Sequence, residues 1–244
     1  MERLLLNSVN RLKKDTRIRE IYLFGSVARG DHDQYSDMDV LVVIDDCSED
    51  EYVQCKDMLA HILNIPVSWL SVYRIAKIKR MHGTGSYFLW HIKKEGKLLY
   101  SRDGELGLLL STLPQYSDVR KDLEEYSSIL SDVTKEINNK YICVEYELSV
   151  LASLVRNTCI AIAYLDGEMN FGRTSVVRYC FSKHKVNVTL EEYEKLYQYR
   201  LFYTGKIRNV PVGEMAQLKK WINIERILLE IVEKGIKNYE KEII

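Results

Sequence analysis

The sequence is poor in the residues that mark several protein classes. It has only 3 prolines among 244 residues and shows no internal repeat or low-complexity segment. Its 5 cysteines are odd in number and form no Cys-x-x-Cys pair, which speaks against a disulfide framework or a zinc site. We therefore expect reduced thiols, as in a cytoplasmic protein.

The sequence also lacks an excess of charge of either sign. Its 35 acidic side chains are balanced by 35 basic ones, so the net positive charge typical of a dedicated DNA- or RNA-binding protein is missing. A zero net charge does not exclude a local basic patch. The same balance provides no acidic excess that would attract a polycationic aminoglycoside. We expect no nucleic-acid partner.

Long apolar runs are missing as well. No run approaches the roughly 20 residues that span a bilayer. The apolar segment near the N-terminus is too short for a signal peptide and continues as an amphipathic helix. We expect a cytoplasmic protein without a membrane partner.

What is present differs between the two halves of the chain. In the first hundred residues short β-rich runs alternate with helical ones, and we predict strands at 18–26, 38–45, 65–73 and 97–103, with helices at 48–63 and 86–96. Ser48 followed by Glu51 is a capping-box signature, and Gly96 is expected to end the second helix. Residues 1–113 are therefore expected to form an α/β (α+β) domain with a mixed sheet.

After residue 113 the strand signals fade. Helical periodicity takes over, at 116–138, 143–165, 189–203 and 213–238. Thr189 with Glu192 is a second capping box. Residues 114–244 are expected to form an all-α helical bundle.

The chemistry is concentrated in residues 22–43, YLFGSVARGDHDQYSDMDVLVV. A strand runs into Gly25-Ser26, where a glycine allows close approach of a ligand and a serine hydroxyl with backbone N–H groups suits a phosphate oxygen. Asp37 and Asp39 then open the next apolar run. They share one face of the expected strand, about 7 Å apart along it, whereas Met38 points into the core.

Two carboxylates on an otherwise apolar strand need a compensating partner. Aspartate is depleted in strands, and two on one face cost stability unless they are paired or bound to a metal. Mg²⁺ takes one or two protein carboxylates and completes its shell with water and substrate phosphates. Asp37 and Asp39 are therefore candidate ligands of Mg²⁺ or Mn²⁺ facing a phosphate site at Gly25 and Ser26.

This pattern resembles the signature of the minimal nucleotidyltransferases in the DNA polymerase β-like superfamily: Gly-Ser, ten residues, then Asp-x-Asp. The resemblance implies that Ser26 contacts the phosphates of a nucleoside triphosphate, with ATP as the first choice. It also implies that Asp37 and Asp39 are catalytic metal ligands. Arg29 and Ser36 complete the candidate nucleotide-binding set; Arg29 is equally suited to pair with Asp31 or Asp33.

One part of the family pattern is missing. Members usually supply a third carboxylate from a later strand, but the matching run IPVSWLSVY has Ser68 and Ser71 there. Glu95 follows in a helix and is interpreted as a solvated charge, with His91 in a structural role. The site could have two carboxylates only, receive a third acid from the helical half, or have lost its activity.

The helical half resembles, by its helix pattern, the HEPN domains that accompany minimal nucleotidyltransferases. Some of these are toxins that cut RNA with an arginine and a histidine four to six residues apart, a spacing that Arg178 and His184 match. The pattern is loose, and we interpret both as residues of a helix surface. The two-domain layout also resembles that of antibiotic nucleotidyltransferases.

The preferred hypothesis is a Mg²⁺-dependent nucleotidyltransferase. It would move a nucleoside monophosphate from an NTP to a hydroxyl of a small-molecule, antibiotic-like acceptor or of a protein. The alternatives are a catalytically impaired nucleotide-sensing or toxin–antitoxin-type module, or an RNase that uses Arg178 and His184. The oligomeric state stays open, a homodimer included.

Overall fold

A computed structural model describes the backbone of residues 2–243 and the side chains of residues 5–239. The chain divides into two compact units, Met1–Ser117 and Asp118–Ile244, each with its own core. The division falls a few residues after the boundary expected at 113/114.

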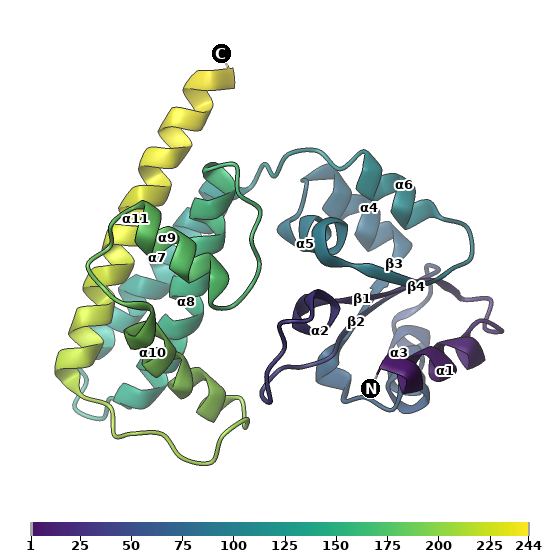
Figure 1. Cartoon of the computed structure of the whole chain (residues 1–244), viewed down its shortest axis with the longest axis horizontal. Helices are drawn as coiled ribbons and strands as arrows, with labels where there is room; N and C mark the ends of the chain where they lie inside the picture. The colour runs from purple at the N-terminus through teal and green to yellow at the C-terminus, as the bar shows by residue number, and fades with distance from the viewer. Residues whose placement is uncertain (1, 244) are drawn as a thin grey trace. The chain divides into compact units, whose positions relative to one another are not determined.

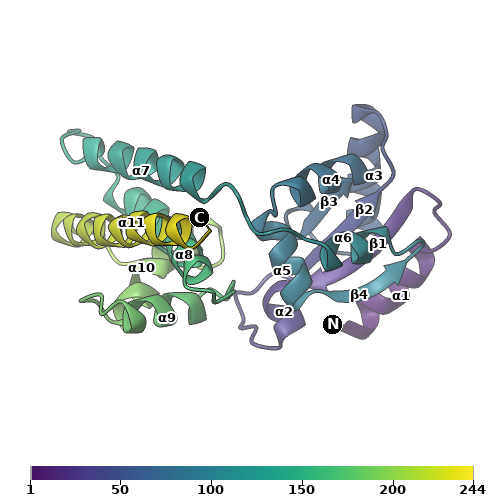
Figure 2. The ribbon, with the colours of Figure 1, turned by 90° about the horizontal axis from the view of Figure 1, so that it is seen from above.

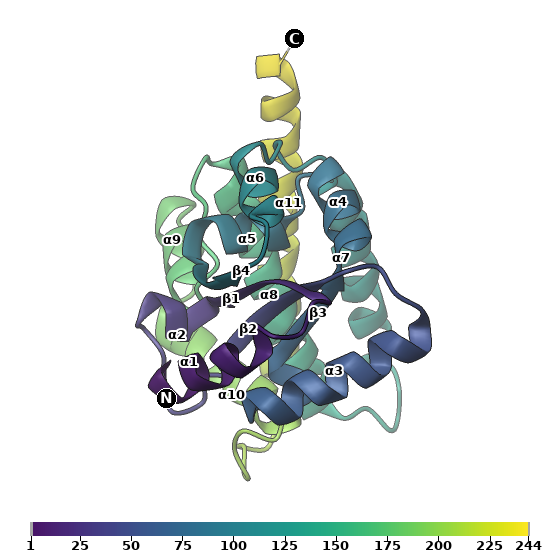
Figure 3. The same ribbon diagram turned by 90° about the vertical axis from the view of Figure 1, so that its right-hand side faces the viewer.

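Unit 1 is built on a four-stranded mixed sheet in the order β3-β2-β1-β4 (Figures 1 and 3). Strand β1 runs antiparallel to β2 and β4, and β2 pairs with β3 in parallel. The strand bounds are β1 Ile18–Phe24, β2 Asp39–Ile44, β3 Leu70–Arg74 and β4 Lys97–Ser101. The predicted α/β (α+β) class with a mixed sheet is confirmed.

Helices cover both faces of the sheet. One face carries α1 and α3 and the other carries α4, α5 and α6 (Figure 1). Their bounds are α1 Glu2–Leu12, α3 Glu49–Leu63, α4 Ile75–Gly83, α5 Tyr87–Glu95 and α6 Glu105–Ser111. Because successive side chains of a strand point to opposite faces, Val40 and Val42 enter the first core and Leu41 and Val43 the second.

Two local expectations for unit 1 were wrong. The run 65–73 was predicted as one strand, but its first part forms the 3₁₀ turn η1 Val67–Trp69 and only the rest pairs with β2. The residues after β1 were expected to continue the strand into a turn. They form the short helix α2 Gly25–Arg29 instead.

The capping box at the start of α3 is present as predicted. Ser48 Oγ accepts a hydrogen bond from the Glu51 N–H, and Glu51 Oε2 accepts one from the Ser48 N–H at 2.9 Å. Ser48→Ala is expected to lower the free energy of unfolding by about 1 kcal/mol, because one helix-end donor loses its acceptor. Urea denaturation measures the change, and Ser48→Asp, which keeps an acceptor, should leave stability within a few tenths of a kcal/mol. Equal loss in both variants would contradict the capping role.

Unit 2 is all helical, as predicted. Its helices are α7 Val119–Glu136, α8 Val144–Leu165, α9 Ser175–Lys183, α10 Leu190–Tyr203 and α11 Met215–Ile243 (Figure 2). Helix α8 contacts each of the other four helices. The capping box of Thr189 and Glu192 starts α10.

Helix α8 is the one described helix long and apolar enough to cross a membrane, with a mean hydropathy of 1.6. The expectation that no apolar run approaches the length needed to span a bilayer therefore does not hold for α8. Yet 67% of that window is buried inside unit 2, so packing against the neighbouring helices accounts for its composition.

Candidate active site

The site begins where β1 ends. Phe24 is the last strand residue, and Gly25 follows with a left-handed backbone (φ +72°), which turns the chain directly into α2. Helix α2 ends after one turn at Gly30 (φ +85°), whose N–H donates to the Ser26 carbonyl at 2.9 Å. Two glycines thus hold the half-buried Ser26 in a tight strand–helix connection.

Asp39 lies directly against Gly25. It is the first residue of β2 and is paired with Phe24 across the sheet. A Cβ atom at Gly25 would lie 2.4 Å from Asp39 Oδ2, closer than any real contact. The missing side chain of Gly25 therefore provides the space that the Asp39 carboxylate occupies.

Asp37 lies just outside the strand, two residues before Asp39. The sequence predicted both aspartates within one strand, but β2 begins only at Asp39. Met38 packs into the core with Val40, and the half-buried Asp37 and Asp39 alternate with them. Asp39 therefore lies on the sheet face opposite Met38, and the place of the Asp37 carboxylate on that face stays a prediction.

The loop between the glycines and the aspartates is closed by its own side chains. Ser36 Oγ donates to Asp33 Oδ1 at 2.9 Å and accepts from the Asp33 N–H at 3.0 Å. In this structure Ser36 shapes the loop, and its contact with a nucleotide stays a prediction.

Arg29 is held between two carboxylates. Its Nε lies 3.1 Å from Asp31 Oδ1, and its Nη1 donates to Glu95 Oε2 at 2.5 Å. The sequence left open whether Arg29 contacts a phosphate or pairs with a nearby aspartate, and the structure contains the ion pair with Asp31.

Glu95 is not a solvated charge, and that expectation was wrong. Its side chain is only 7% exposed, and its Oε2 also lies 2.8 Å from His91 Nε2. Burial raises the pKa of Glu95, but the hydrogen bonds and charges of His91 and Arg29 outweigh it, so the pKa lies below its usual value. His91 and Glu95 stand four residues apart on α5, and this i,i+4 spacing was the signal in the sequence that could have revealed the pair.

The third carboxylate of the family pattern has no counterpart in β3. Ser71 pairs with Leu41 in the sheet register, and Ser68 lies in the 3₁₀ turn before the strand. Within the described part of the chain, no three His, Cys, Asp or Glu side chains gather to hold a metal ion.

The residues that are present fit a hard divalent cation. Asp37 and Asp39 provide carboxylate oxygens at the start of β2, and the Asp39 carboxylate lies against Gly25 at the start of α2. Mg²⁺ and Mn²⁺ suit such oxygen donors, with substrate phosphates and water as further ligands.

The family comparison agrees with this geometry. Residues 7–105 match the model of the family described as "Polymerase beta, Nucleotidyltransferase". Unit 1 is a polymerase β-type nucleotidyltransferase domain. The predicted enzyme class is thereby confirmed, and the Gly-Ser and Asp-x-Asp residues lie inside the matched region.

Two solved structures show weaker likeness to the chain. One is described as a toxin–antitoxin with AMP-PNP, at 22% identity over 53% of this chain and 98% of that chain, with a TM-score of 0.33. The other is spectinomycin adenyltransferase AAD(9) from Enterococcus faecialis with ATP and spectinomycin, at 16% identity over 93% and 98%, with a TM-score of 0.49. A search of curated proteins found no match. Likeness at this level carries no functional argument.

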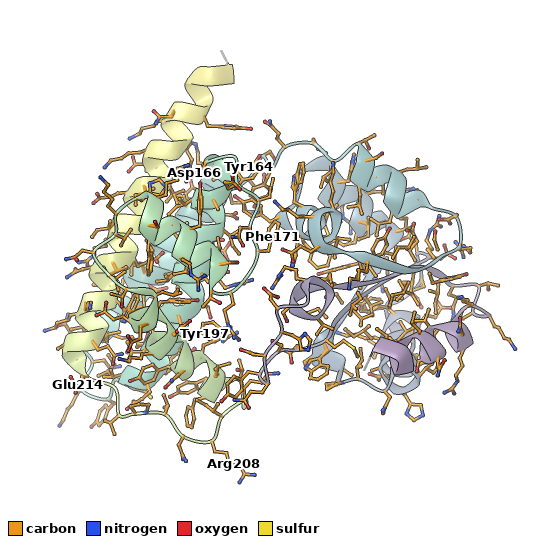
Figure 4. All side chains as sticks on the ribbon, viewed as in Figure 1. Tyr164, Asp166, Phe171, Tyr197, Arg208 and Glu214 are labelled. Atoms are coloured by element: carbon orange, nitrogen blue, oxygen red, sulfur yellow. The ribbon has the colours of Figure 1, made fainter. Side chains whose placement is uncertain are left out.

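Outside the nucleotidyltransferase domain, the structure does not bring Arg178 and His184 together. Arg178 is exposed on α9, and six residues further on His184 caps the helix, about 120° away around its axis. His184 Nε2 lies 2.8 Å from Asp166 Oδ2. Asp166 follows the end of α8 (Figure 4). Tyr179 and Lys183 contact the same carboxylate, so His184 belongs to a local polar cluster.

Proposed function

We propose that this nucleotidyltransferase uses Mg²⁺ to transfer a nucleoside monophosphate from an NTP, with ATP as the first choice, to an acceptor hydroxyl. The observation that carries the proposal is the placement of the Asp39 carboxylate against the left-handed Gly25, with the half-buried Asp37 two residues before it. In the proposal, the backbone at the start of α2 is the phosphate site and the two carboxylates are the metal platform beside it. A cytoplasmic location, where NTPs and Mg²⁺ are available, is part of the proposal.

Each residue has a role in this scheme. Ser26 and the backbone amides of α2 would bind phosphate oxygens, and Asp37 and Asp39 would hold the metal. The ion supplies charge stabilisation for the leaving pyrophosphate and a template for the reacting oxygens. The acceptor oxygen forms a bond to the α-phosphorus, the bond from that phosphorus to the bridging oxygen breaks, pyrophosphate leaves and the hydroxyl proton passes to solvent.

The acceptor is proposed to be a small molecule with a hydroxyl group, and a protein hydroxyl is the competing class. The zero net charge of the chain argues against a polycationic acceptor as the preferred choice. Incubation with each of the four NTPs labelled at the α-phosphate, together with lincosamides, aminoglycosides, tRNA and lysate protein, distinguishes these classes by where the label appears.

Mutation of the two aspartates tests the proposal directly. Wild-type protein is expected to gain several degrees in melting temperature with Mg²⁺ and its NTP, and to transfer label. Asp37→Asn with Asp39→Asn should abolish the Mg²⁺-dependent shift and reduce transfer by at least about a hundredfold, because the metal loses both carboxylates.

The matched control removes two negative charges elsewhere in the same unit. Asp50→Asn with Asp57→Asn changes two exposed residues of α3 and should leave shift and transfer unchanged. No shift of the wild type with any NTP would refute the proposal. A shift without label transfer to any acceptor would identify a nucleotide-sensing module instead.

A further inference from the structure

The second half of α5 is anchored to the short helix α2 by two contacts that are largely shielded from solvent. Glu95 accepts a hydrogen bond from Arg29 Nη1, and the His91 ring packs edge-on against Phe24 with ring centres 5.2 Å apart. Phe24 and Arg29 stand at the two ends of α2. Helix α5 therefore contacts both ends of the segment that contains Gly25 and Ser26.

Helix α2 needs such an anchor because it is only five residues long. A helix of one turn is not stable by itself and takes its position from the side chains that tie it to the rest of the domain. Its last residue, Arg29, forms ion pairs with Glu95 of α5 and with Asp31 of the loop that follows Gly30. The Glu95 carboxylate is nearly inaccessible to water, so its bond to Arg29 is the less screened of the two.

His91 in turn orients the Glu95 carboxylate. Both His91 Nε2 and Arg29 Nη1 contact the same oxygen, Glu95 Oε2. A histidine one turn earlier on the same helix restricts the rotamer of the glutamate, as the partners of metal-bound or catalytic side chains do. The chain of contacts runs from His91 through Glu95 and Arg29 to the helix that starts at Gly25.

We propose that Glu95 is a positioning residue for nucleotide binding: through Arg29 it holds α2 so that Ser26 and Gly25 stay in register with Asp39. The inference rests on the proposed function, because it assigns a purpose to a neighbour of the same site. It also assigns Arg29 to the support of the site and not to direct contact with phosphate. This ion pair fits the purpose, since its loss leaves Arg29 only the more exposed Asp31 and leaves the buried Glu95 carboxylate only His91.

A double-mutant cycle tests this assignment. Glu95→Gln and Arg29→Gln are each expected to raise KM for the NTP about tenfold with kcat changed less than about threefold, and the double variant should be no worse than either single one. If Arg29 bound phosphate directly, Glu95→Gln would leave KM unchanged or lower it, and only variants without Arg29 would lose affinity. That result would overturn the inference.

Two further measurements keep the test decisive. The double variant contains no unpaired buried charge and is expected to fold; if it binds NTP as well as wild type, the inference is wrong. Asp31→Asn is the matched control, because it removes the exposed partner of Arg29 and should change KM by less than about twofold.

Hydrogen exchange separates this inference from the proposed function. In the absence of nucleotide, the amides of residues 25–30 should exchange about tenfold faster in Glu95→Gln than in wild type, and at the wild-type rate in Asp37→Asn with Asp39→Asn. Unchanged exchange in Glu95→Gln would overturn the positioning role itself. Faster exchange in Glu95→Gln, combined with a wild type that binds no NTP, would overturn the proposed function and leave only the support of α2 by Glu95.

Discussion

Gly25→Ala is expected to abolish Mg²⁺-dependent NTP binding and to lower the free energy of unfolding by about 2–4 kcal/mol. An alanine at φ +72° costs about 1–2 kcal/mol in backbone conformation alone. Its Cβ would in addition lie 2.4 Å from Asp39 Oδ2. Since this atom belongs to a carboxylate at the start of a paired strand, either Asp39 or α2 must move, and the phosphate site and the metal site lose their register.

Gly30→Ala is the matched control for this variant. Gly30 has a similar left-handed backbone (φ +85°), but nothing lies within 4 Å of the position that its Cβ would take. This variant should lose about 1–2 kcal/mol of stability and retain its NTP shift. Urea denaturation and thermal shift with Mg²⁺ and NTP measure both quantities. Retained nucleotide binding in Gly25→Ala would show that the contact between Gly25 and Asp39 does not organise the site.

Glu225→Gln is expected to stabilise the protein at alkaline pH by a few kcal/mol. Glu225 is 0% exposed in the core of unit 2, where Thr158 Oγ1 donates to its Oε1 at 2.5 Å. Its Oε2 is buried and has no hydrogen-bond partner among the described residues. Burial raises the pKa of Glu225 to about 8, and the hydrogen bond from Thr158 opposes this only in part.

The direction of the pH dependence follows from where the proton is bound. Between the ordinary pKa of about 4.5 and the folded value of about 8, the native state holds a proton that the unfolded chain has released. The contribution of Glu225 to the free energy of unfolding of the wild type is therefore largest below about pH 4.5. It falls as the pH rises towards 8 and stays low above that pH. Glutamine has the same shape and no charge, so the stability of the variant should not fall with pH at this position.

Urea denaturation from pH 5 to pH 9.5 measures the effect. The difference between Glu225→Gln and wild type should grow with pH and level off above about pH 8, whereas other titrating groups contribute equally to both proteins. Glu230→Gln, which changes an exposed residue of α11, should follow the wild-type curve. A constant difference across the range would contradict a buried, protonated Glu225.

Much of the site could be predicted from the sequence because its signals are local. The Gly-Ser dipeptide, the ten-residue spacing and the Asp-x-Asp at the head of an apolar run lie within residues 25–39. Two capping boxes started helices where they were expected, since the cap and its partner are three residues apart. The helical second half followed from periodicity alone.

The errors concern features that depend on distant partners. Glu95 looked like a surface charge because nothing near it in the sequence shows that Arg29, far earlier in the chain, will pair with it. The run 65–73 alternates like a strand, but only the part that finds β2 as a neighbour becomes one.

By itself, the sequence determined the class of the first unit and the helical nature of the second, and it predicted the residues of a phosphate and metal platform. These depend on periodicity, glycine placement and the spacing of a few side chains. Only the tertiary structure decided that Asp39 fills the space left by Gly25, that Glu95 accepts a hydrogen bond from Arg29, and that Glu225 is buried beside Thr158. The physical reason is that desolvation and side-chain pairing depend on which elements pack together, and that is settled when the chain folds.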